Sequence, residues 1–330
     1  MLSIQEARKR LPKKFMENMY EMFSPGTVDK LVSGMLSEKY TTLRVNTIKY
    51  NIQDLMKNLK ENNIKFERVQ WYNDALIIKN VKEKDIQKLD IYEKGYIYLQ
   101  SLPSMVPPIV LNPKEGEKVL DLTAAPGSKT TQIAALMNNK GYILANELDK
   151  IRCERLKYNV SAQGAIIVEV LNGRGEQLGT KYENYFDKVL LDAPCSGEGR
   201  FDAKSVITYK NWSEKTVRDL AKLQKKLFKS AYTTLKQGGI MVYSTCTLNK
   251  EENEKILQWA LENLNIKLLD INIEVKEAIP AFNDNNIDNE DFNNFRQIND
   301  TKKMDNLNKA IRILPSKNME GFFVAKLQKI

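Results

Sequence analysis

A recurrent pattern of short, continuously apolar runs, separated by longer helical stretches, begins near residue 117 and constrains the fold most strongly. Such runs are typical of parallel strands that are covered by helices on both faces. The pattern therefore predicts an α/β fold with a doubly wound, Rossmann-like sheet. The predicted strands are Val119–Leu122, Tyr142–Asn146, Ile166–Val170, Lys188–Asp192 and Gly239–Ser244, with helices near 128–138, 149–162 and 213–236, and with Asn265–Ile273 and Gly321–Leu327 as two further strands at one edge.

The first hundred residues predict a smaller α+β unit. Phe15, Met19 and Phe23 recur at helical spacing. Pro103, Pro107 and Pro108 punctuate the passage into the larger part of the chain, so we expect one domain at 1–102 and a second at 103–330. Within the first, we expect a strand at Thr42–Thr47, a helix near Ile52–Asn62, and strands near Phe66–Trp71, Ala75–Lys79 and Gly95–Gln100. The Asn- and Asp-rich stretch 282–310 predicts a long loop with little core of its own.

The chain is basic. It has 51 lysines and arginines against 42 acidic residues, which gives a formal net charge of +9. This surplus favours a polyanionic partner, because phosphate contacts release condensed counterions. A solvated basic surface explains the charge equally well. The charge is concentrated at Lys204–Lys236, which has nine basic and two acidic side chains, and the N-terminal unit adds Arg8, Lys9, Arg10, Lys13 and Lys14, with Trp71 and Tyr72 as possible stacking groups.

The numbers and spacing of the cysteine and histidine residues limit the kinds of catalysis and of metal site that the protein can have. The sequence contains no histidine, which excludes Ser-His and Cys-His catalysis and any His-ligated metal. The three cysteines, Cys153, Cys195 and Cys246, are widely spaced, which argues against a disulfide framework and against a zinc site. We therefore expect no metal. No apolar run has signal-peptide or membrane-spanning length, so we expect a soluble, cytoplasmic protein without membrane contact.

The loop after the first strand of the large domain predicts a cofactor site. Ligands of doubly wound sheets bind at the carboxyl ends of the strands. A loop of small residues allows the backbone to approach a ligand, and the following helix presents free N–H groups. The spacings of dinucleotide and Walker loops are absent. An ordinary strand-to-helix turn is the alternative. The predicted cofactor-binding residues of this loop are Ala124, Ala125, Pro126, Gly127, Ser128, Lys129 and Thr130.

The next two strand ends add two candidate cofactor contacts. Glu147 follows the second strand, where a carboxylate can accept hydrogen bonds from two ribose hydroxyls. Asn172 follows the third strand, where an amide can reach an adenine edge. A solvated loop acid and a plain Asn-Gly turn are the respective alternatives.

Two cysteine motifs follow the fourth and fifth strands: Asp192-Ala-Pro-Cys195-Ser and Thr245-Cys246-Thr. With Ala124–Thr130 and Glu147, they resemble the Sun/Nop-type (RsmB/RsmF-like) family of RNA cytosine-5 methyltransferases. The resemblance also includes Leu43-Arg-Val-Asn-Thr47, Arg312-Ile-Leu-Pro315 and Glu320-Gly-Phe-Phe323, and so spans nearly the whole chain. It implies a class I methyltransferase sheet at 103–330, an RNA-binding domain at 1–102, and S-adenosylmethionine as the cofactor.

The resemblance also implies roles for the site residues. Cys246 matches the nucleophile that adds to carbon 6 of cytosine and thereby activates carbon 5, which is covalent catalysis. Cys195 matches the second cysteine, which helps to resolve the adduct. Asp192 matches the acid that contacts the cytosine, a general-acid role, and it is also a predicted cofactor-binding residue. The DNA enzymes take their nucleophile from the Pro-Cys segment instead. For Cys153 we expect packing as a small apolar side chain.

The sequence leaves more than one RNA target open. We expect ribosomal RNA, as for the 16S rRNA enzyme RsmF, with the target cytosine single-stranded or flipped out. Transfer RNA is the alternative, because the chain stops after the catalytic domain, as the shorter archaeal transfer RNA enzymes do. A non-catalytic RNA-binding or ribosome-assembly factor is a further alternative, which predicts an eroded cofactor loop or a lost nucleophile. We expect a monomer.

Overall fold

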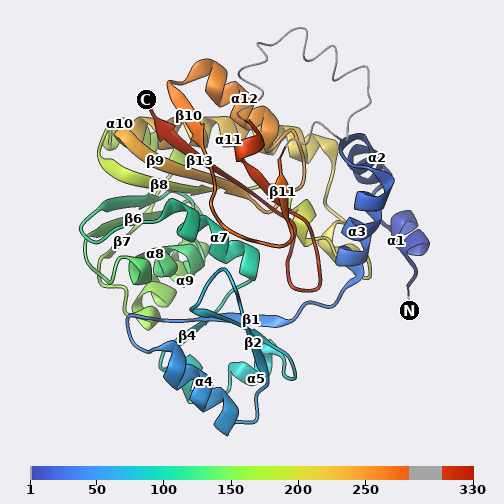
Figure 1. Cartoon of the computed structure of the whole chain (residues 1–330). Helices are drawn as coiled ribbons and strands as arrows, with labels where there is room; N and C mark the ends of the chain where they lie inside the picture. The colour runs from blue at the N-terminus through green and yellow to red at the C-terminus, as the bar shows by residue number, and fades with distance from the viewer. Residues whose placement is uncertain (1, 282–306) are drawn as a thin grey trace.

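The computed structural model describes residues 2–281 and 307–330. Two separate sheets organise the chain, a large one in the upper part of Figure 1 and a small one below it. Three N-terminal helices lie to the right of both. They are α1 (Ile4–Arg10), α2 (Lys13–Met22) and α3 (Pro25–Leu36).

The small sheet is antiparallel, with the strand order β2-β3-β1-β4. Its four strands are those that the sequence predicts, within a few residues at each end. Leu43 and Leu76 of the sheet pack with Leu55 and Leu59 of a covering helix to form a small core. The elements are β1 (Thr41–Val45), α4 (Ile52–Glu61), β2 (Phe66–Arg68), β3 (Ala75–Ile78), α5 (Glu83–Ile86), α6 (Asp90–Glu93) and β4 (Ile97–Leu99).

The N-terminal helices pack mainly on the other part of the chain. Phe15 of α2 lies 5.0 Å from Phe201, between ring centroids, and 6.2 Å from Trp212. These helices therefore share a core with segments that follow residue 200. A domain boundary at residue 102 stays a prediction. Trp71 and Tyr72 stack on each other and pack against the main core.

The large sheet has nine strands in the order β11-β12-β13-β9-β8-β5-β6-β7, with β10 paired to β13. Strands β7, β6, β5, β8 and β9 are parallel, and β10 to β13 are antiparallel additions. Helices cover both faces, so the predicted doubly wound α/β sheet is confirmed (Figure 1). The strands are β5 (Lys118–Asp121), β6 (Tyr142–Glu147), β7 (Val168–Asn172), β8 (Phe186–Asp192), β9 (Leu235–Thr245), β10 (Ile266–Leu269), β11 (Ala278–Pro280), β12 (Ile311–Ile313) and β13 (Phe322–Lys329).

Two helical layers bury the large sheet. One contains α7 (Leu102–Leu111), α8 (Ser128–Leu136) and α9 (Lys150–Gln163), which contribute Met105, Ile133 and Leu156 to one core. The other contains α10 (Leu178–Lys181), α11 (Glu214–Thr234) and α12 (Glu254–Asn263), which contribute Leu227, Phe228 and Ile256 to a second core. Short 3₁₀ turns lie at Gly175–Gln177 (η1), Glu198–Arg200 (η2), Val206–Thr208 (η3) and Leu307–Lys309 (η5).

The structure corrects two sequence-based expectations. The proline-rich passage that begins at Leu102 is the buried helix α7, which contains Pro103, Pro107 and Pro108. Pro103 occupies the first turn, where a missing N–H is tolerated, and packing on the sheet outweighs the low helix propensity of the other two prolines. Strand β13 lies inside the sheet between β9 and β12, and its first four residues, Phe322–Ala325, are apolar and buried. Of the expected 282–310 loop, residues 282–306 lie outside the described part.

The Leu43–Thr47 segment joins the small sheet to the catalytic part. The buried guanidinium of Arg44 donates to Gln100 Oε1 at 2.8 Å and to Thr131 Oγ1 at 2.7 Å, and it also reaches the carbonyl of Ser128. Asn46 donates from its amide to the carbonyls of Gly95 and Gln163. The small sheet is thus hydrogen-bonded to the start of α8 and the end of α9. No helix of the described residues is long and apolar enough to cross a membrane.

Candidate active site

A cavity of about 720 Å³ opens at the carboxyl ends of the parallel strands. Because all of these strands point the same way, the loops that follow them converge at one edge of the sheet. The cavity brings together Cys195, Cys246 and Asp192 with most of the loop Ala124–Lys129 and with Glu147. Sequence segments more than 120 positions apart therefore form one site.

The two motif cysteines are in contact. The Sγ atoms of Cys195 and Cys246 lie 3.0 Å apart, and the backbone N–H of Cys246 donates to Cys195 Sγ at 3.2 Å. Neither cysteine forms a disulfide. Cys153 lies elsewhere, fully buried in α9, where burial raises the pKa of its thiol.

The electrostatics of this pair distinguish its two members. The two thiols share a hydrogen bond, and this bond is the main cause of a lowered Cys246 pKa, with Arg200 and Lys129 lowering it further. The same bond, together with burial, raises the pKa of Cys195. A thiolate is a far better nucleophile than a thiol. The lowered pKa favours the thiolate form at Cys246 over that at Cys195.

Backbone and side-chain contacts hold the two cysteine loops together. Gly199 donates from its N–H to the carbonyl of Cys246 at 3.0 Å, and Gly321 donates to the carbonyl of Gly199 at 2.8 Å. A Cβ on Gly199 would lie 1.9 Å from the oxygen of Gly321, so the η2 turn and the segment before β13 meet backbone to backbone. The carboxylate of Glu252 accepts from the N–H of Ser196 at 2.9 Å and from Gln224 Nε2 at 3.0 Å. These bonds set the Pro-Cys-Ser loop against the loop that carries Cys246.

Asp192 is fully engaged on both oxygens. Lys129 Nζ donates to Asp192 Oδ2 at 2.6 Å, and the Ser244 hydroxyl donates to Oδ1 at 2.8 Å. Asp192 and Ser244 are register partners in the parallel pair β8/β9. The Thr123 hydroxyl donates to the carbonyl of Asp192 at 2.8 Å, so it supports this strand end. Lys129, predicted as a cofactor contact, thus lies in an ion pair with the acid beside the cysteines.

The rest of the Ala124–Thr130 loop forms the wall of the cavity. Ala124, Ala125, Pro126 and Ser128 line it, whereas Gly127 and Thr130 lie behind. Gly127 begins α8 with φ +106, and a Cβ there would lie 3.0 Å from Leu156 Cδ1, which explains the need for glycine. Thr130 donates from its hydroxyl to the buried Asp121 carboxyl at 2.7 Å. Burial raises the pKa of Asp121 to about 7.

The two other predicted cofactor contacts differ in their placement. Glu147 lies at the end of β6 with its side chain 5% exposed, lines the cavity, and accepts from the N–H of Asp149 at 2.9 Å. Asn172 does not line the cavity. Its amide donates to the carbonyls of Glu147 and Leu148 at 2.7 and 2.9 Å. In this arrangement Asn172 supports the loop that presents Glu147.

Several cavity residues were not predicted from the sequence. Arg200 of η2 and Glu320 line the cavity opposite the cofactor loop, and Ser101 and Ser104 line it from the start of α7. Phe322 also lines it, with Lys129 Nζ 5.6 Å from the centroid of its ring. Glu320 and Phe322 lie in the Glu320–Phe323 motif, which was a usable signal. Ser101, Ser104 and Arg200 carry no local pattern that would mark them.

One residue of the cavity has a buried polar atom that is left for a polar cofactor. Asn146 lines the cavity, and the Oδ1 atom of this residue is a buried oxygen with no hydrogen-bond donor among the described residues. Buried acceptors of this kind are normally paired, so a ligand hydroxyl or ammonium group fits here beside the Glu147 carboxylate. Within residues 2–281 and 307–330, no cluster of three or more Cys, Asp or Glu side chains is arranged to hold a metal ion.

Comparison with known proteins identifies the family. The sequence model of the family described as 16S rRNA methyltransferase RsmB/F matches residues 108–328, and that of the N-terminal domain of 16S rRNA methyltransferase RsmF matches residues 11–102. The chain is 37% identical over 290 residues to the tRNA (cytosine(49)-C(5))-methyltransferase of Pyrococcus abyssi, covering 87% of this chain and 88% of that protein.

Other relatives agree. The ribosomal RNA small subunit methyltransferase F of Pectobacterium carotovorum is 32% identical over 326 residues, which cover 97% of this chain and 63% of that protein. The chain thus spans less than two thirds of this bacterial relative. The crystal structure of a methyltransferase homologue from Pyrococcus horikoshii superposes with a TM-score of 0.82 at 30% identity and full coverage of both chains. The predicted resemblance is confirmed: the chain belongs to the RsmB/F family of S-adenosylmethionine-dependent methyltransferases.

Proposed function

We propose that this protein transfers the methyl group of S-adenosylmethionine to carbon 5 of a cytosine in RNA, through a covalent adduct between Cys246 and carbon 6. The observation that carries this proposal is the contact between Cys195 and Cys246, whose Sγ atoms are 3.0 Å apart beside Asp192. The names of the relatives support RNA and carbon 5 as the target. A factor without catalytic activity, with an eroded loop or a lost nucleophile, does not fit a chain that retains both.

The chain's own residues account for activation of the base. The Cys246 thiolate adds to carbon 6, and the electron pair of the 5,6 double bond moves into the ring toward nitrogen 3. The proton that neutralises the charge on nitrogen 3 comes from the ion pair of Lys129 and Asp192, joined at 2.6 Å: Asp192 takes it from the Lys129 ammonium group and donates it to nitrogen 3. When bound, S-adenosylmethionine supplies the electrophilic methyl group for carbon 5.

The second cysteine acts in product release. Transfer of the carbon 5 proton to solvent water restores the 5,6 double bond and breaks the bond between carbon 6 and Cys246 Sγ, so Cys246 leaves as a thiolate. The Cys195 thiol lies within hydrogen-bond distance of that sulfur and stabilises it as it departs. This assignment follows from the lowered pKa of Cys246 and the raised pKa of Cys195.

S-adenosylmethionine fits the residues of the cavity. Glu147 would hold the ribose hydroxyls, Asn146 would accept a further donor, and the small side chains Ala124 and Ala125 would allow the backbone close to the ligand. Glu147→Ala should weaken binding of S-adenosylmethionine by about 1–3 kcal/mol in calorimetry, because buried hydroxyls would lose their acceptor. Glu154→Ala, on the exposed face of α9, is the matched control and should bind normally. Unchanged binding by the Glu147 variant would contradict this placement.

For the RNA target, we propose ribosomal RNA of the small subunit. Both family models that match, one of them specific to the N-terminal domain of the RsmF enzyme, describe 16S rRNA methyltransferases. Transfer RNA is the second candidate, because the chain covers 88% of the archaeal transfer RNA enzyme but only 63% of a bacterial ribosomal RNA enzyme.

Bisulfite sequencing of total RNA from a strain that lacks the gene tests the target. We expect one or more 5-methylcytosines of small-subunit ribosomal RNA to disappear and to return when the gene is restored. Restoration with the Cys246→Ala variant should leave the positions unmethylated. Loss confined to transfer RNA would select the second candidate, and an unchanged methylation map would contradict the proposed activity.

A further inference from the structure

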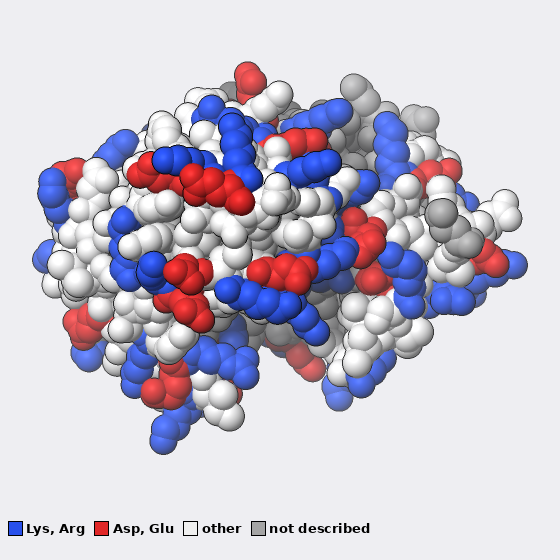
Figure 2. Space-filling view, turned by 90° about the horizontal axis from the view of Figure 1, so that it is seen from below, with Lys and Arg blue, Asp and Glu red and all other residues white. Residues whose placement is uncertain are grey.

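A second cavity of about 920 Å³ lies outside the active site, between the N-terminal helices and the small sheet. We call it the lysine groove. Figure 2 shows Lys and Arg side chains on both sides of the hollow that the molecule presents when it is seen from below. Five lysines and one acid, Glu38, are among the lining residues of the groove; the lysines are Lys39, Lys79, Lys82, Lys204 and Lys317.

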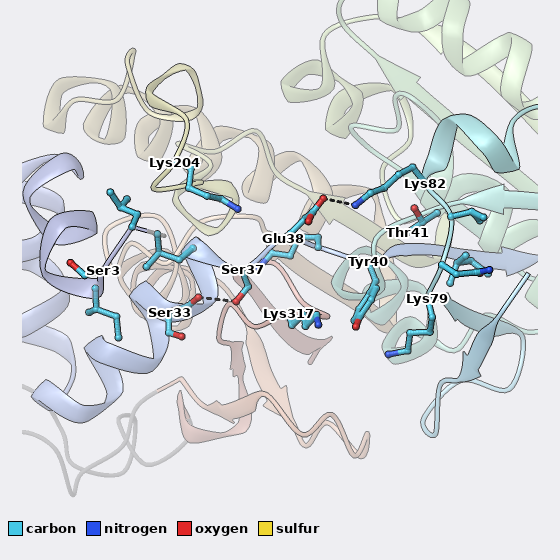
Figure 3. A pocket seen from close by; sticks show the side chains of 17 residues that line it. Ser3, Ser33, Ser37, Glu38, Tyr40, Thr41, Lys79, Lys82, Lys204 and Lys317 are labelled. Atoms are coloured by element: carbon cyan, nitrogen blue, oxygen red, sulfur yellow. Dashed lines mark hydrogen bonds and ion pairs between the residues drawn. The ribbon is translucent and has the colours of Figure 1, made fainter.

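The lysines reach the groove from separate elements, as Figure 3 shows for four of them. Lys79 and Lys82 follow β3, Lys204 lies between η2 and η3, and Lys317 lies in the β12–β13 loop. No local stretch of sequence therefore encodes this charge. Lys204 and Lys317 are exposed, and neither has an acidic partner within ion-pair distance in the described part of the chain.

Tyr40 orders two of these cations. The Nζ atoms of Lys79 and Lys317 lie 4.0 and 4.5 Å from the centroid of its ring. Both ammonium groups therefore lie within cation–π distance of the same ring, although Lys79 also pairs with Glu67 at 2.7 Å. An arrangement that concentrates positive charge in a groove is favourable for a ligand with repeated negative charges.

The acid that lines the groove is held weakly. Glu38 pairs with Lys82 in Figure 3, and both side chains are about two thirds or more exposed, at 74% and 66%. Exposed ion pairs contribute only about 0–1 kcal/mol. An arriving phosphate can therefore replace the Glu38 carboxylate as the partner of Lys82 at little cost.

The groove adjoins the active site. Lys39, which lines the groove, attracts the buried carboxylate of Glu320, which lines the catalytic cavity, and Glu320 is also attracted by Arg200. Ala203 donates from its N–H to the carbonyl of Met35 at 3.2 Å, so the segment with Lys204 follows directly from the η2 turn and rests on the end of α3. The short segment from Arg200 to Lys204 therefore runs from the catalytic cavity, which Arg200 lines, to the groove, which Lys204 lines.

The basic face of α11 is the competing path for a polyanion. Lys222 pairs there with Asp219 at 3.5 Å and Lys225 lies 5.7 Å from the centroid of the Trp259 ring, whereas Lys215, Arg218, Lys226 and Lys229 are exposed without an acidic partner among the described residues. Lys204, the first residue of the basic stretch that the sequence singled out, faces the groove instead.

We propose that the lysine groove binds the phosphodiester backbone of the single-stranded RNA that flanks the target cytidine, with Lys204 and Lys317 each contacting a phosphate. This proposal rests on the proposed RNA methyltransferase activity and adds to it the path of the substrate strand. Lys82 joins as a third contact once Glu38 is displaced.

The test compares two doubly neutralised proteins with equal loss of charge. One is Lys204→Gln/Lys317→Gln, and the control is Lys255→Gln/Lys267→Gln, whose side chains lie on α12 and β10 away from both cavities. Binding of a fluorescein-labelled, 20-nucleotide single-stranded RNA with a central cytidine is measured against salt. For the groove variant we expect about tenfold weaker binding, and a salt slope smaller by about 0.7 per lost phosphate contact. A control-like affinity and slope would overturn the proposal.

Kinetics and crosslinking separate the possible failures. With total RNA from a strain lacking the gene and tritiated S-adenosylmethionine, the groove variant should show a raised KM for RNA and an unchanged kcat. If the wild-type protein transfers no methyl group to RNA, the proposed function fails; if it does and both double variants equal it, only the groove proposal fails. Photocrosslinking of the same oligonucleotide with 4-thiouridine beside the cytidine should label peptides containing Tyr40 or Lys317. Labelling confined to α11 would assign the strand to that helix and overturn the proposal.

Discussion

The Sγ atom of Cys195 lies 3.0 Å from the Sγ atom of Cys246, at the ends of two neighbouring parallel strands. The backbone N–H of Cys246 also donates to Cys195, so the two loops are joined at this point. Each cysteine is thus part of the other's environment, and their roles can be separated only by removing them one at a time.

Removal of each thiol should have opposite effects on the covalent adduct. Cys246→Ala should abolish methylation and any covalent complex with RNA, because the nucleophile is gone. Cys195→Ala should allow attack and methyl transfer but slow the release of Cys246, so a protein–RNA species should survive denaturing electrophoresis. A complex trapped by Cys246→Ala and absent in Cys195→Ala would reverse the roles. Normal turnover of both variants would exclude the covalent mechanism.

The hydrogen bond from Cys195 should be visible in the titration of Cys246. This bond is the largest cause of the lowered Cys246 pKa. Cys195→Ala should therefore raise that pKa, and alkylation of Cys246 by iodoacetamide should reach half its maximal rate at a higher pH. The pH dependence is followed by mass spectrometry of the Cys246 peptide, with the buried Cys153 replaced by Ser as a control for the background reaction. A midpoint that does not move would mean that the two thiols titrate independently.

Lys129 and Asp192 should act as one unit on the cytosine ring. Lys129→Met or Asp192→Asn should each slow adduct formation by about 10²–10⁴, the usual contribution of one acid–base group. Because the two side chains share a 2.6 Å ion pair, the double variant should be little slower than either single variant. Rapid-quench measurement of adduct formation with RNA tests both statements. Lys250→Met, an exposed lysine paired with Glu21, should react at the wild-type rate. Multiplicative losses in the double variant would show that the groups act separately.

The buried pair of Arg312 and Glu254 should matter for stability rather than for catalysis. Their side chains are 1% and 4% exposed, and Arg312 also donates to the carbonyl of Ala281 at 2.9 Å. Arg312→Met should lower the free energy of unfolding by about 3–5 kcal/mol, because it leaves a buried carboxylate without its partner. Arg312→Met/Glu254→Leu should recover most of this loss. Urea denaturation followed by circular dichroism measures both.

The control for that measurement is an exposed pair of similar geometry. Lys255→Met, which breaks the i,i+4 pair with Glu251 on the surface, should cost no more than about 1 kcal/mol. If the Arg312 variant costs as little as this control, the buried pair contributes nothing beyond a surface pair.

Asp121 should make stability depend on pH. Burial raises its folded pKa to about 7, above the value of about 4 that it has in an unfolded chain. The folded state then binds more protons than the unfolded state between these values, so the contribution of Asp121 is fully present below about pH 4 and is lost as the pH rises to about 7. Asp121→Asn should flatten the decline of the urea midpoint across this range. Burial also raises the pKa of Glu198 to about 7, so the urea midpoint of the Asp121→Asn variant should still decline to some extent across this range. A slope unchanged by Asp121→Asn would contradict the raised pKa.

The strand pattern and the motifs at the strand ends were sufficient to predict the doubly wound sheet and the convergence of Cys195, Cys246, Asp192 and Glu147. The physical reason is geometric: parallel strands in one sheet end at the same edge, so residues placed just after each strand must meet there. The family resemblance could be recognised from the sequence for the same reason, because most of its motifs lie at those strand ends. The roles of the two cysteines stay predictions until the variants above are measured.

The tertiary structure alone decided the contacts that no local pattern encodes. Helix α7 forms in spite of its prolines because it is buried against the sheet. Lys129 of α8, which lines the cavity, pairs there with Asp192 at the end of β8, a contact between two residues that are 63 positions apart in the sequence. The lysine groove gathers Lys79, Lys204 and Lys317 from three distant segments. The local sequence determines helix or strand propensity and the period of the apolar residues, which is about 3.6 residues in a helix and about 2 in a strand. Which side chains of different elements come into contact depends on long-range packing, and these periods contain no information about it.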